Sequence, residues 1–320
     1  MRRWGLLAAG LCVALGISAT FAWRRLDAAG PLPADRTIVV APGTTAQLGA
    51  ALTEVELVTS PLEFRLAAWA TRTDAALRQG EFAFHAHASL RQILTILRTA
   101  RRIQHRITIP EGLTAAQIAR LLDRNELLDG DLVLPAEGAV LPQTYAFERG
   151  THRAILLNRM TAAMDKQRDE LWTNRAPNLP LSSPTDLITL ASLVERETAR
   201  PEERPHVAAV FLNRLRAGMR LQSDPTIVYV ASFGLGSLDH PITRGELDAA
   251  TPYNTYRIAG LPPGPIASPG LASLQAVAHP IMSDDLYFVA DGAGGHSFAR
   301  TLEDHNRNVA RLRAAAAVKK

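Results

Sequence analysis

The sequence predicts an α+β fold class: an N-terminal transmembrane helix, a small strand and helix module, and then a larger C-terminal α+β domain. Three observations predict it. Twenty uncharged residues occupy positions 4–23, a phrase of strand, glycine turn and helix occurs twice, and helical patterns alternate with glycine- and proline-rich loops near the C-terminus. The predicted parts are residues 1–25, 26–105, 106–180 and 181–320.

Length and composition indicate a globular protein of more than one domain. The 320 residues are 47% hydrophobic and 21% charged, which is enough to build two separate cores. The net charge is only +4, and the densest basic segment, residues 98–106, has no aromatic side chain for stacking on bases. Nucleic-acid binding is therefore not expected. Cys12 is the single cysteine, which excludes an intrachain disulfide.

The N-terminal segment is long enough to span a bilayer. Residues 4–23, "WGLLAAGLCVALGISATFAW", lie between two arginine pairs and carry tryptophan at both ends, where interfacial anchors occur. A cleaved signal peptide is the alternative, because residues 18–22 are mostly small. Since the run exceeds a typical signal core, we expect a single-pass inner (plasma) membrane anchor with the body on the periplasmic, extracytoplasmic side.

The next residues predict a small strand and helix module. A strand at 37–41, a Pro-Gly turn and a helix at 45–53 are followed by a strand at 82–88 and a helix capped by Ser89. Residues 46–48 and 116–118 match, which suggests a second strand, turn and helix at 107–125. His85 and His87 share a strand face, but no Cys, Asp or Glu partner has ligand spacing, which favours two exposed histidines over a metal pair.

A helix that begins after a linker carries two acidic residues of interest. The linker is residues 173–184, Ser183 is the expected N-cap, and Asp186 completes a capping box. At about 100° per residue, Glu195 and Glu197 lie roughly 200° apart on opposite margins of the apolar stripe. They cannot form the paired carboxylates of a two-carboxylate glycosidase. Either could act alone, and Glu197, beside the apolar row, is favoured because desolvation would raise its pKa.

The residues after this helix form a second helix, 202–218, and then loops dense in polar and aromatic side chains. The segments are "RLQSDPT", "TPYNTY", "GLPPGPIASPG", "AHP" and "YFVADGAGGHSF". Binding and catalytic groups tend to lie in such loops. The sequence has no HExxH motif and no clustered ligand set, so we expect neither a metal nor another cofactor.

These segments, together with "ASLVERET" and "ERPHVAAVFLNRLRAGM", resemble the YceG-like endolytic murein transglycosylases over residues 184–310. The resemblance implies a membrane-anchored lytic transglycosylase with a LysM-like module at 26–105 and a catalytic domain at 181–320. It implies cleavage of the β-1,4 bond between N-acetylmuramic acid and N-acetylglucosamine, with 1,6-anhydro ends as products and termination of glycan elongation as the result. Residues 129–180 and 230–247 match the family less well.

The resemblance assigns the catalytic role to Glu197, the second glutamate of its E-x-E-T motif, and leaves Glu195 as a structural partner for an arginine. The loops supply predicted contacts to sugar hydroxyl and acetamido groups: Gln222, Ser223, Asp224, Tyr253, Asn254, Thr255, Tyr256 and His296. Asp224 could equally be a turn residue before Pro225, and His296 could equally just end its glycine loop.

Two other functions stay open from the sequence. One is a catalytically inactive peptidoglycan-binding scaffold that recruits cell-wall synthases, and the other is a muramidase that uses water and leaves reducing ends. Peptidoglycan strands, the membrane and cell-wall synthases are the expected partners.

Overall fold

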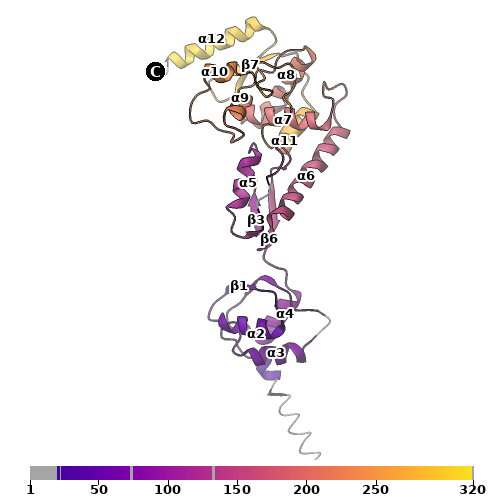
Figure 1. Cartoon of the computed structure of the whole chain (residues 1–320), viewed down its shortest axis with the longest axis vertical. Coiled ribbons are helices and arrows are strands. Elements are labelled where there is room, and N and C mark those ends of the chain that lie inside the picture. The colour runs from indigo at the N-terminus through magenta and orange to yellow at the C-terminus, as the bar shows by residue number, and fades with distance from the viewer. Residues whose placement is uncertain (1–19, 22, 73–74, 132–133, 319–320) are drawn as a thin grey trace, which may run out of the picture. The chain divides into compact units, whose positions relative to one another are not determined.

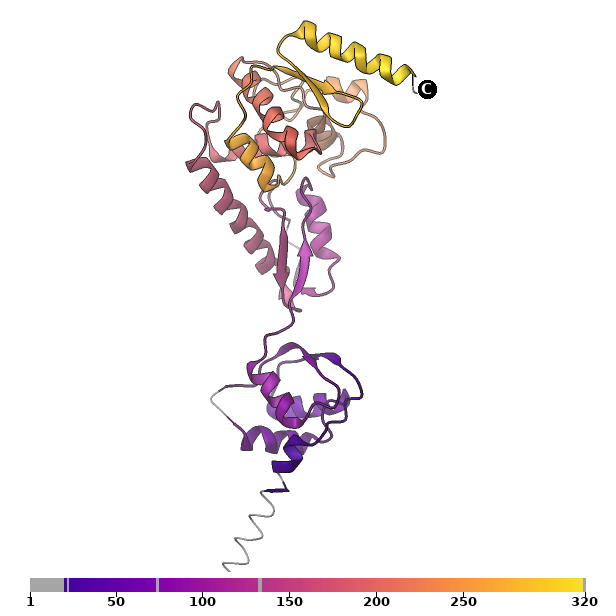
Figure 2. The same cartoon turned by 180° about the vertical axis from the view of Figure 1, so that it is seen from behind.

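A computed structural model describes residues 20–21, 23–72, 75–131 and 134–318. The chain divides into two compact units, Met1–His105 and Arg106–Lys320 (Figures 1 and 2). The segment 106–180 belongs to the same compact unit as residues 181–320.

In the first unit, three of the described helices pack against an antiparallel strand pair. Its elements are β1 (Arg36–Val40), α2 (Thr45–Glu54), α3 (Pro61–Ala70), β2 (Gly80–Phe84) and α4 (Leu90–Thr99). Strands β1 and β2 pair in a register that sets Ile38 opposite Phe82. Both side chains are buried with Phe64 of α3 and Leu94 of α4 in a single apolar cluster, so the helices are held by burial of one face each.

The repeated phrase in the sequence has a simple physical cause. Thr44 and Gln47 form a capping box at the start of α2, and Thr114 and Gln117 form the same box at the start of α5 (Ala115–Asp123). In each box the threonine side chain accepts from the third helical amide, while the glutamine side chain accepts from the threonine amide. The sequence match between residues 46–48 and 116–118 therefore reflects two helices that begin with the same capping box.

The second unit begins with short strands and a long helix. Its first elements are β3 (His105–Thr108), α5, β4 (Leu128–Asp129), β5 (Thr144–Phe147), β6 (Thr151–His152) and α6 (Arg153–Thr173). Strand β3 pairs with β5, and β4 pairs in parallel with β6. Ile118 of α5, Phe147 of β5 and Leu156 of α6 share one buried cluster.

The remaining elements of this unit surround a second, larger cluster. They are α7 (Pro184–Glu197), a 3-10 turn η1 (Pro201–Glu203), α8 (Arg204–Arg216), α9 (Asp224–Ala231), α10 (Arg244–Asp248), α11 (Leu271–Ala278), β7 (Tyr287–Ala290), β8 (His296–Ala299) and α12 (Leu302–Val318). Helices α7, α8 and α11 pack on one another, and α12 lies along the β7–β8 hairpin (Figure 1). Leu190, Phe211 and Val277 are fully buried where the three helices meet.

The structure corrects the expected fold class in one respect, the N-terminal transmembrane helix. No helix in the described part of the chain is long and apolar enough to cross a membrane. Most of the predicted span, residues 4–23, lies outside the described residues.

His85 and His87 are both exposed, as expected, but the prediction that they share a strand face is wrong. Strand β2 ends at Phe84, and His87 has a positive φ of 57°, so the alternation of side chains stops before the two histidines. His85 Nδ1 lies 3.0 Å from Asp35 Oδ2, whereas His87 Nδ1 lies 3.4 Å from the Gly30 carbonyl oxygen.

Candidate active site

The local sequence of α7 determines where Glu197 lies. The Ser183 side chain accepts from the Asp186 amide at 3.2 Å, the Asp186 carboxylate accepts from the Ser183 amide at 3.1 Å, and Pro184 takes the first turn, as predicted. The helix then runs through an apolar stretch that is buried from Leu187 to Val194. Glu197 is its last residue, so the carboxyl stands at the end of a rigid, buried element.

Glu197 is surrounded by protein yet keeps some contact with solvent. Burial raises its pKa from 4.5 to about 7, against the hydrogen bond from Ser223, which favours the ionised form. The charge of Asp224 raises the pKa further, while those of His296 and Arg214 lower it. Ser223 Oγ donates to Glu197 Oε2 at 2.9 Å. A carboxyl with this pKa can both give and take a proton near neutral pH.

Two loops that are distant in sequence are joined beneath Glu197. The Ser223 amide donates to Thr255 Oγ1 at 2.9 Å, and the Gln222 amide donates to the Thr255 carbonyl oxygen at 3.2 Å. Thr226 Oγ1 lies 3.0 Å from Thr255 Oγ1. These contacts fix Ser223, and through it the orientation of the Glu197 carboxyl.

Asp224 brings a second carboxylate close to Glu197. It is exposed at the start of α9 and accepts a hydrogen bond from Tyr256 Oη at 2.5 Å. Burial raises the pKa of Tyr256 above its usual range, and the hydrogen bond to Asp224 adds to the rise. The phenol therefore keeps its proton and holds the Asp224 side chain in place.

Arg214 is a functional neighbour that the sequence did not reveal. It lies on α8 and is buried, with Nε donating to the Leu286 carbonyl at 2.6 Å and Nη1 to the Leu221 carbonyl at 2.7 Å. Burial lowers its pKa, yet the guanidinium charge still favours the ionised form of Glu197. The only signal in the sequence was an arginine on the apolar side of a helix.

His296 is held in place by a carboxylate from η1. Its Nδ1 lies 2.7 Å from Glu203 Oε2, and its amide donates to Glu203 Oε1 at 3.0 Å. Glu203 also accepts from Thr198 Oγ1 at 3.0 Å, next to Glu197 in sequence. Burial opposes ionisation, but the bonds from His296 and Thr198 prevail and keep the pKa of Glu203 below its usual range.

Glu195 has the structural role that was predicted for it. Its side chain is 5% exposed, and it pairs with Arg204 at 2.9 Å while accepting from the Gly270 amide and from Ser273 Oγ. Arg204 also reaches Glu111 at 3.0 Å. The network joins α7, α8, the start of α11 and the loop after β3.

Arg196 also holds the end of α7. It is exposed as a residue, but its guanidinium donates to the carbonyl oxygens of Gly112 at 3.3 Å and Gly236 at 2.9 Å. The end of α7 is therefore fixed on this side as well.

The other predicted contacts separate into two groups. Asn254 and Thr255 are buried. The Asn254 Nδ2 donates to the carbonyl oxygens of Leu247 and Ala249, and its Oδ1 accepts from the Tyr256 amide, so the side chain supports the loop. Gln222 is exposed, and Tyr253 is partly exposed with its ring 5.2 Å from that of Tyr229. Gln222 and Tyr253 are therefore the residues of this set that a ligand can reach.

No group of three or more His, Cys, Asp or Glu side chains among the described residues could hold a metal ion.

Comparisons with known proteins agree on one family. A family model described as "YceG-like family" matches residues 38–311. The chain is 38% identical over 203 residues to an endolytic murein transglycosylase of Streptococcus pneumoniae, covering 61% of this chain and 35% of that protein. It is 35% identical over 188 residues to the one of Bacillus subtilis, covering 57% and 49%. The chain thus spans less than half the length of these curated relatives.

Among solved structures, the chain is similar to a putative yceG-like protein of Listeria monocytogenes, with a TM-score of 0.51 and 28% identity. That match covers 85% of this chain and 98% of the other.

Proposed function

Because the chain belongs to the YceG-like family, we propose that it is an endolytic murein transglycosylase whose catalytic acid and base is Glu197. The relatives of that name support the activity. The observation that carries the proposal is the Glu197 carboxyl, which stands at the end of α7 with a pKa of about 7. A group half protonated near neutral pH suits a reaction that needs an acid first and a base second.

In the proposed reaction Glu197 gives up one proton and then takes another. Protonated Glu197 gives its proton to the glycosidic oxygen as the bond from C1 of N-acetylmuramic acid to that oxygen breaks. The carboxylate then takes the proton of the C6 hydroxyl of the same sugar while the C6 oxygen bonds to C1. The nucleophile is held within the substrate, so no water is consumed and the product is a 1,6-anhydro end.

Each neighbour of Glu197 has a defined part in this proposal. The Ser223 hydroxyl orients the carboxyl and stabilises it after it has lost its proton. Arg214 and His296 oppose an excessive rise of the pKa, while Asp224 keeps it high. Asp224 is also the carboxylate that a water-using muramidase would need, so product chemistry separates the two reactions.

Digestion of polymeric, uncrosslinked glycan with product masses read by mass spectrometry tests the proposal. The wild-type protein is expected to release 1,6-anhydro ends, and Glu197→Gln to lower the release by about 10²- to 10⁴-fold. Glu202→Gln is the matched control, because Glu202 is exposed in η1. Reducing ends would indicate a muramidase, and binding to sacculi without any cleavage would indicate a scaffold.

The finer parts of the function belong to the same proposal. We propose that the catalytic unit, Arg106–Lys320, lies outside the cytosol with its substrate. We also propose that cell-wall synthases are its partners and that the first unit binds glycan as a LysM-like module. Protease added to intact spheroplasts should digest the chain, and glycan pull-down by a Glu197→Gln chain should weaken when the first unit is deleted. Protection from protease would contradict the location.

A further inference from the structure

Helix α3 of the first unit is apolar on two opposite faces. Its sequence is PLEFRLAAWA, in which Glu63 and Arg65 are the only charged residues. At about 100° per residue, Phe64, Ala67 and Ala68 share one side, while Leu62, Leu66 and Trp69 lie within about 60° of one another on the opposite side. An apolar face of a helix is normally buried against another surface.

The first unit covers only one of these two faces. Phe64, Ala67 and Ala68 are buried in its core. Leu62 is 59% exposed, Leu66 is 57% exposed and Trp69 is 64% exposed. Isolated exposed apolar side chains are ordinary, but three large ones at helical spacing on one face indicate an interaction surface.

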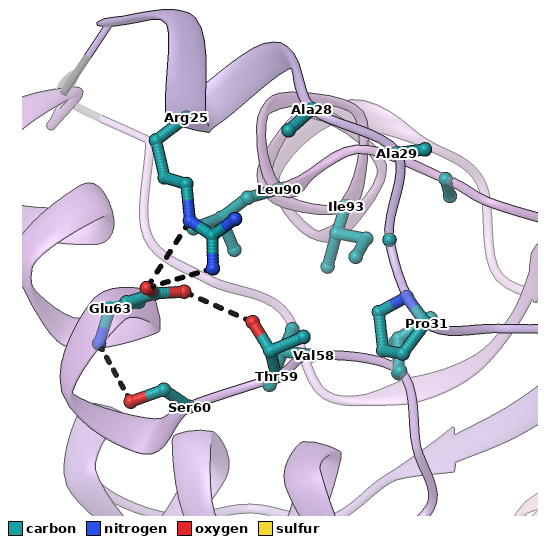
Figure 3. A pocket seen from close by; sticks show the side chains of 13 residues that line it. Arg25, Ala28, Ala29, Pro31, Val58, Thr59, Ser60, Glu63, Leu90 and Ile93 are labelled. Carbon is teal, nitrogen blue, oxygen red and sulfur yellow. Dashed lines mark hydrogen bonds and ion pairs between the residues drawn. The ribbon is translucent and has the colours of Figure 1, made fainter. Parts of the chain in front are cut away.

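The apolar surface continues into a groove beside α3. Arg25, from the helical residues 23–27, pairs with Glu63 at 3.4 Å and so lies next to the first turn of α3 (Figure 3). A groove of about 190 Å³ adjoins this contact, and its lining is almost wholly apolar. Its lining residues are Arg25, Leu26, Glu63, Leu66, Ala67, Ala70 and Leu90.

The charges around this surface are mainly positive. Arg65 is exposed on α3, Arg24 is exposed in the neighbouring helical residues, and the Arg72 guanidinium lies 5.7 Å from the Trp69 ring centroid. Two nearby acidic groups are paired with arginine: Glu63 with Arg25, and Asp27 with Arg91 at 2.6 Å. An apolar face with tryptophan, bordered by arginine, complements the boundary between acyl chains and anionic headgroups.

We propose that the outward face of α3, formed by Leu62, Leu66 and Trp69, rests on the surface of a lipid bilayer that carries anionic headgroups. This contact is peripheral: the side chains enter the headgroup region, and Arg24, Arg65 and Arg72 face the lipid phosphates. A free phosphate would not bind in this way, because it offers nothing to the aliphatic side chains. The proposal is independent of the proposed enzymatic function.

Quenching of Trp69 by lipids with brominated acyl chains tests this contact directly. The sequence has four tryptophans, so the full chain with Trp4→Phe, Trp23→Phe and Trp172→Phe reports on Trp69 alone. Vesicles of brominated phosphatidylcholine with about 30% phosphatidylglycerol should quench its emission, and high salt should weaken the effect. Because the readout is local, attachment by any other part of the chain does not produce it.

Two variants in this background sharpen the test. Leu62→Ser/Leu66→Ser should lower the quenching by about tenfold at limiting lipid, and Arg24→Glu/Arg65→Glu should abolish the advantage of anionic over neutral vesicles. Ile281→Ser/Met282→Ser is the matched control, since these residues are exposed and apolar but belong to the other unit. Unquenched Trp69 emission in vesicle-bound protein would overturn the proposal. If the chain instead self-associates with rising concentration, and Leu62→Ser/Leu66→Ser abolishes this, the face binds a second copy of the chain.

Discussion

The neighbours of Glu197 act on its pKa with opposite signs, which gives the pH dependence of the activity a definite pattern. The acid form must start the proposed reaction, so the rate should fall as pH rises through about 7. Ser223→Ala removes a hydrogen bond to the ionised form and should move this fall to higher pH. Asp224→Asn removes a repelling charge and should move it to lower pH. Profiles of kcat/KM against pH check both directions, and equal shifts of the two variants would contradict the assignment.

The same raised pKa has a cost in stability. An unfolded Glu197 titrates near 4.5 and the folded one near 7, so the folded state binds more protons between these values. Stability contributed by this site is therefore lost as pH rises from about 4.5 to 7, by up to about 3 kcal/mol. Glu197→Gln should be more stable than wild type at pH 8 and similar to it at pH 4, as measured by urea unfolding. Glu202→Gln should show no such gain.

The loop of the β7–β8 hairpin depends on a close approach to η1. A Cβ added at Gly295 would meet Glu203 Oε1 and would lie 2.8 Å from Arg200 Nη1. Gly295→Ala should therefore separate Glu203 from His296. Because a small displacement of a positioned group has a large effect on the rate, we expect kcat to fall by about tenfold or more. Gly245→Ala in α10, where nothing lies within 4 Å, is the control and should keep full activity. Unchanged kinetics of Gly295→Ala would show that the hairpin does not position the site.

Local signals predicted the elements, whereas contacts between elements were out of reach. Ser183, Pro184 and Asp186 act within one turn, so the start of α7 could be found from the sequence alone. The pairing of Glu195 with an arginine was confirmed, but neither Arg204 nor Glu111 could be named, because the three come together only after folding.

The roles within the loops were harder to predict for the same reason. Asn254 and Tyr253 are adjacent polar residues in one motif, yet one is buried against the carbonyls of Leu247 and Ala249 and the other reaches solvent. Spacing cannot distinguish them, because a loop has no fixed period that relates position to burial. His296 is a further case, since its contact with Glu203 spans 93 residues.

The two compact units have separate cores, and this determines how the whole chain should unfold. Leu94 lies in the core of the first unit, whereas Leu190 lies in a cluster of the second. Replacing either by alanine leaves a cavity that costs about 2–5 kcal/mol. Calorimetry should therefore resolve two transitions, with Leu94→Ala lowering the midpoint of one and Leu190→Ala that of the other. If each variant shifted both transitions, the units would be coupled; if neither did, the cores would be wrongly assigned.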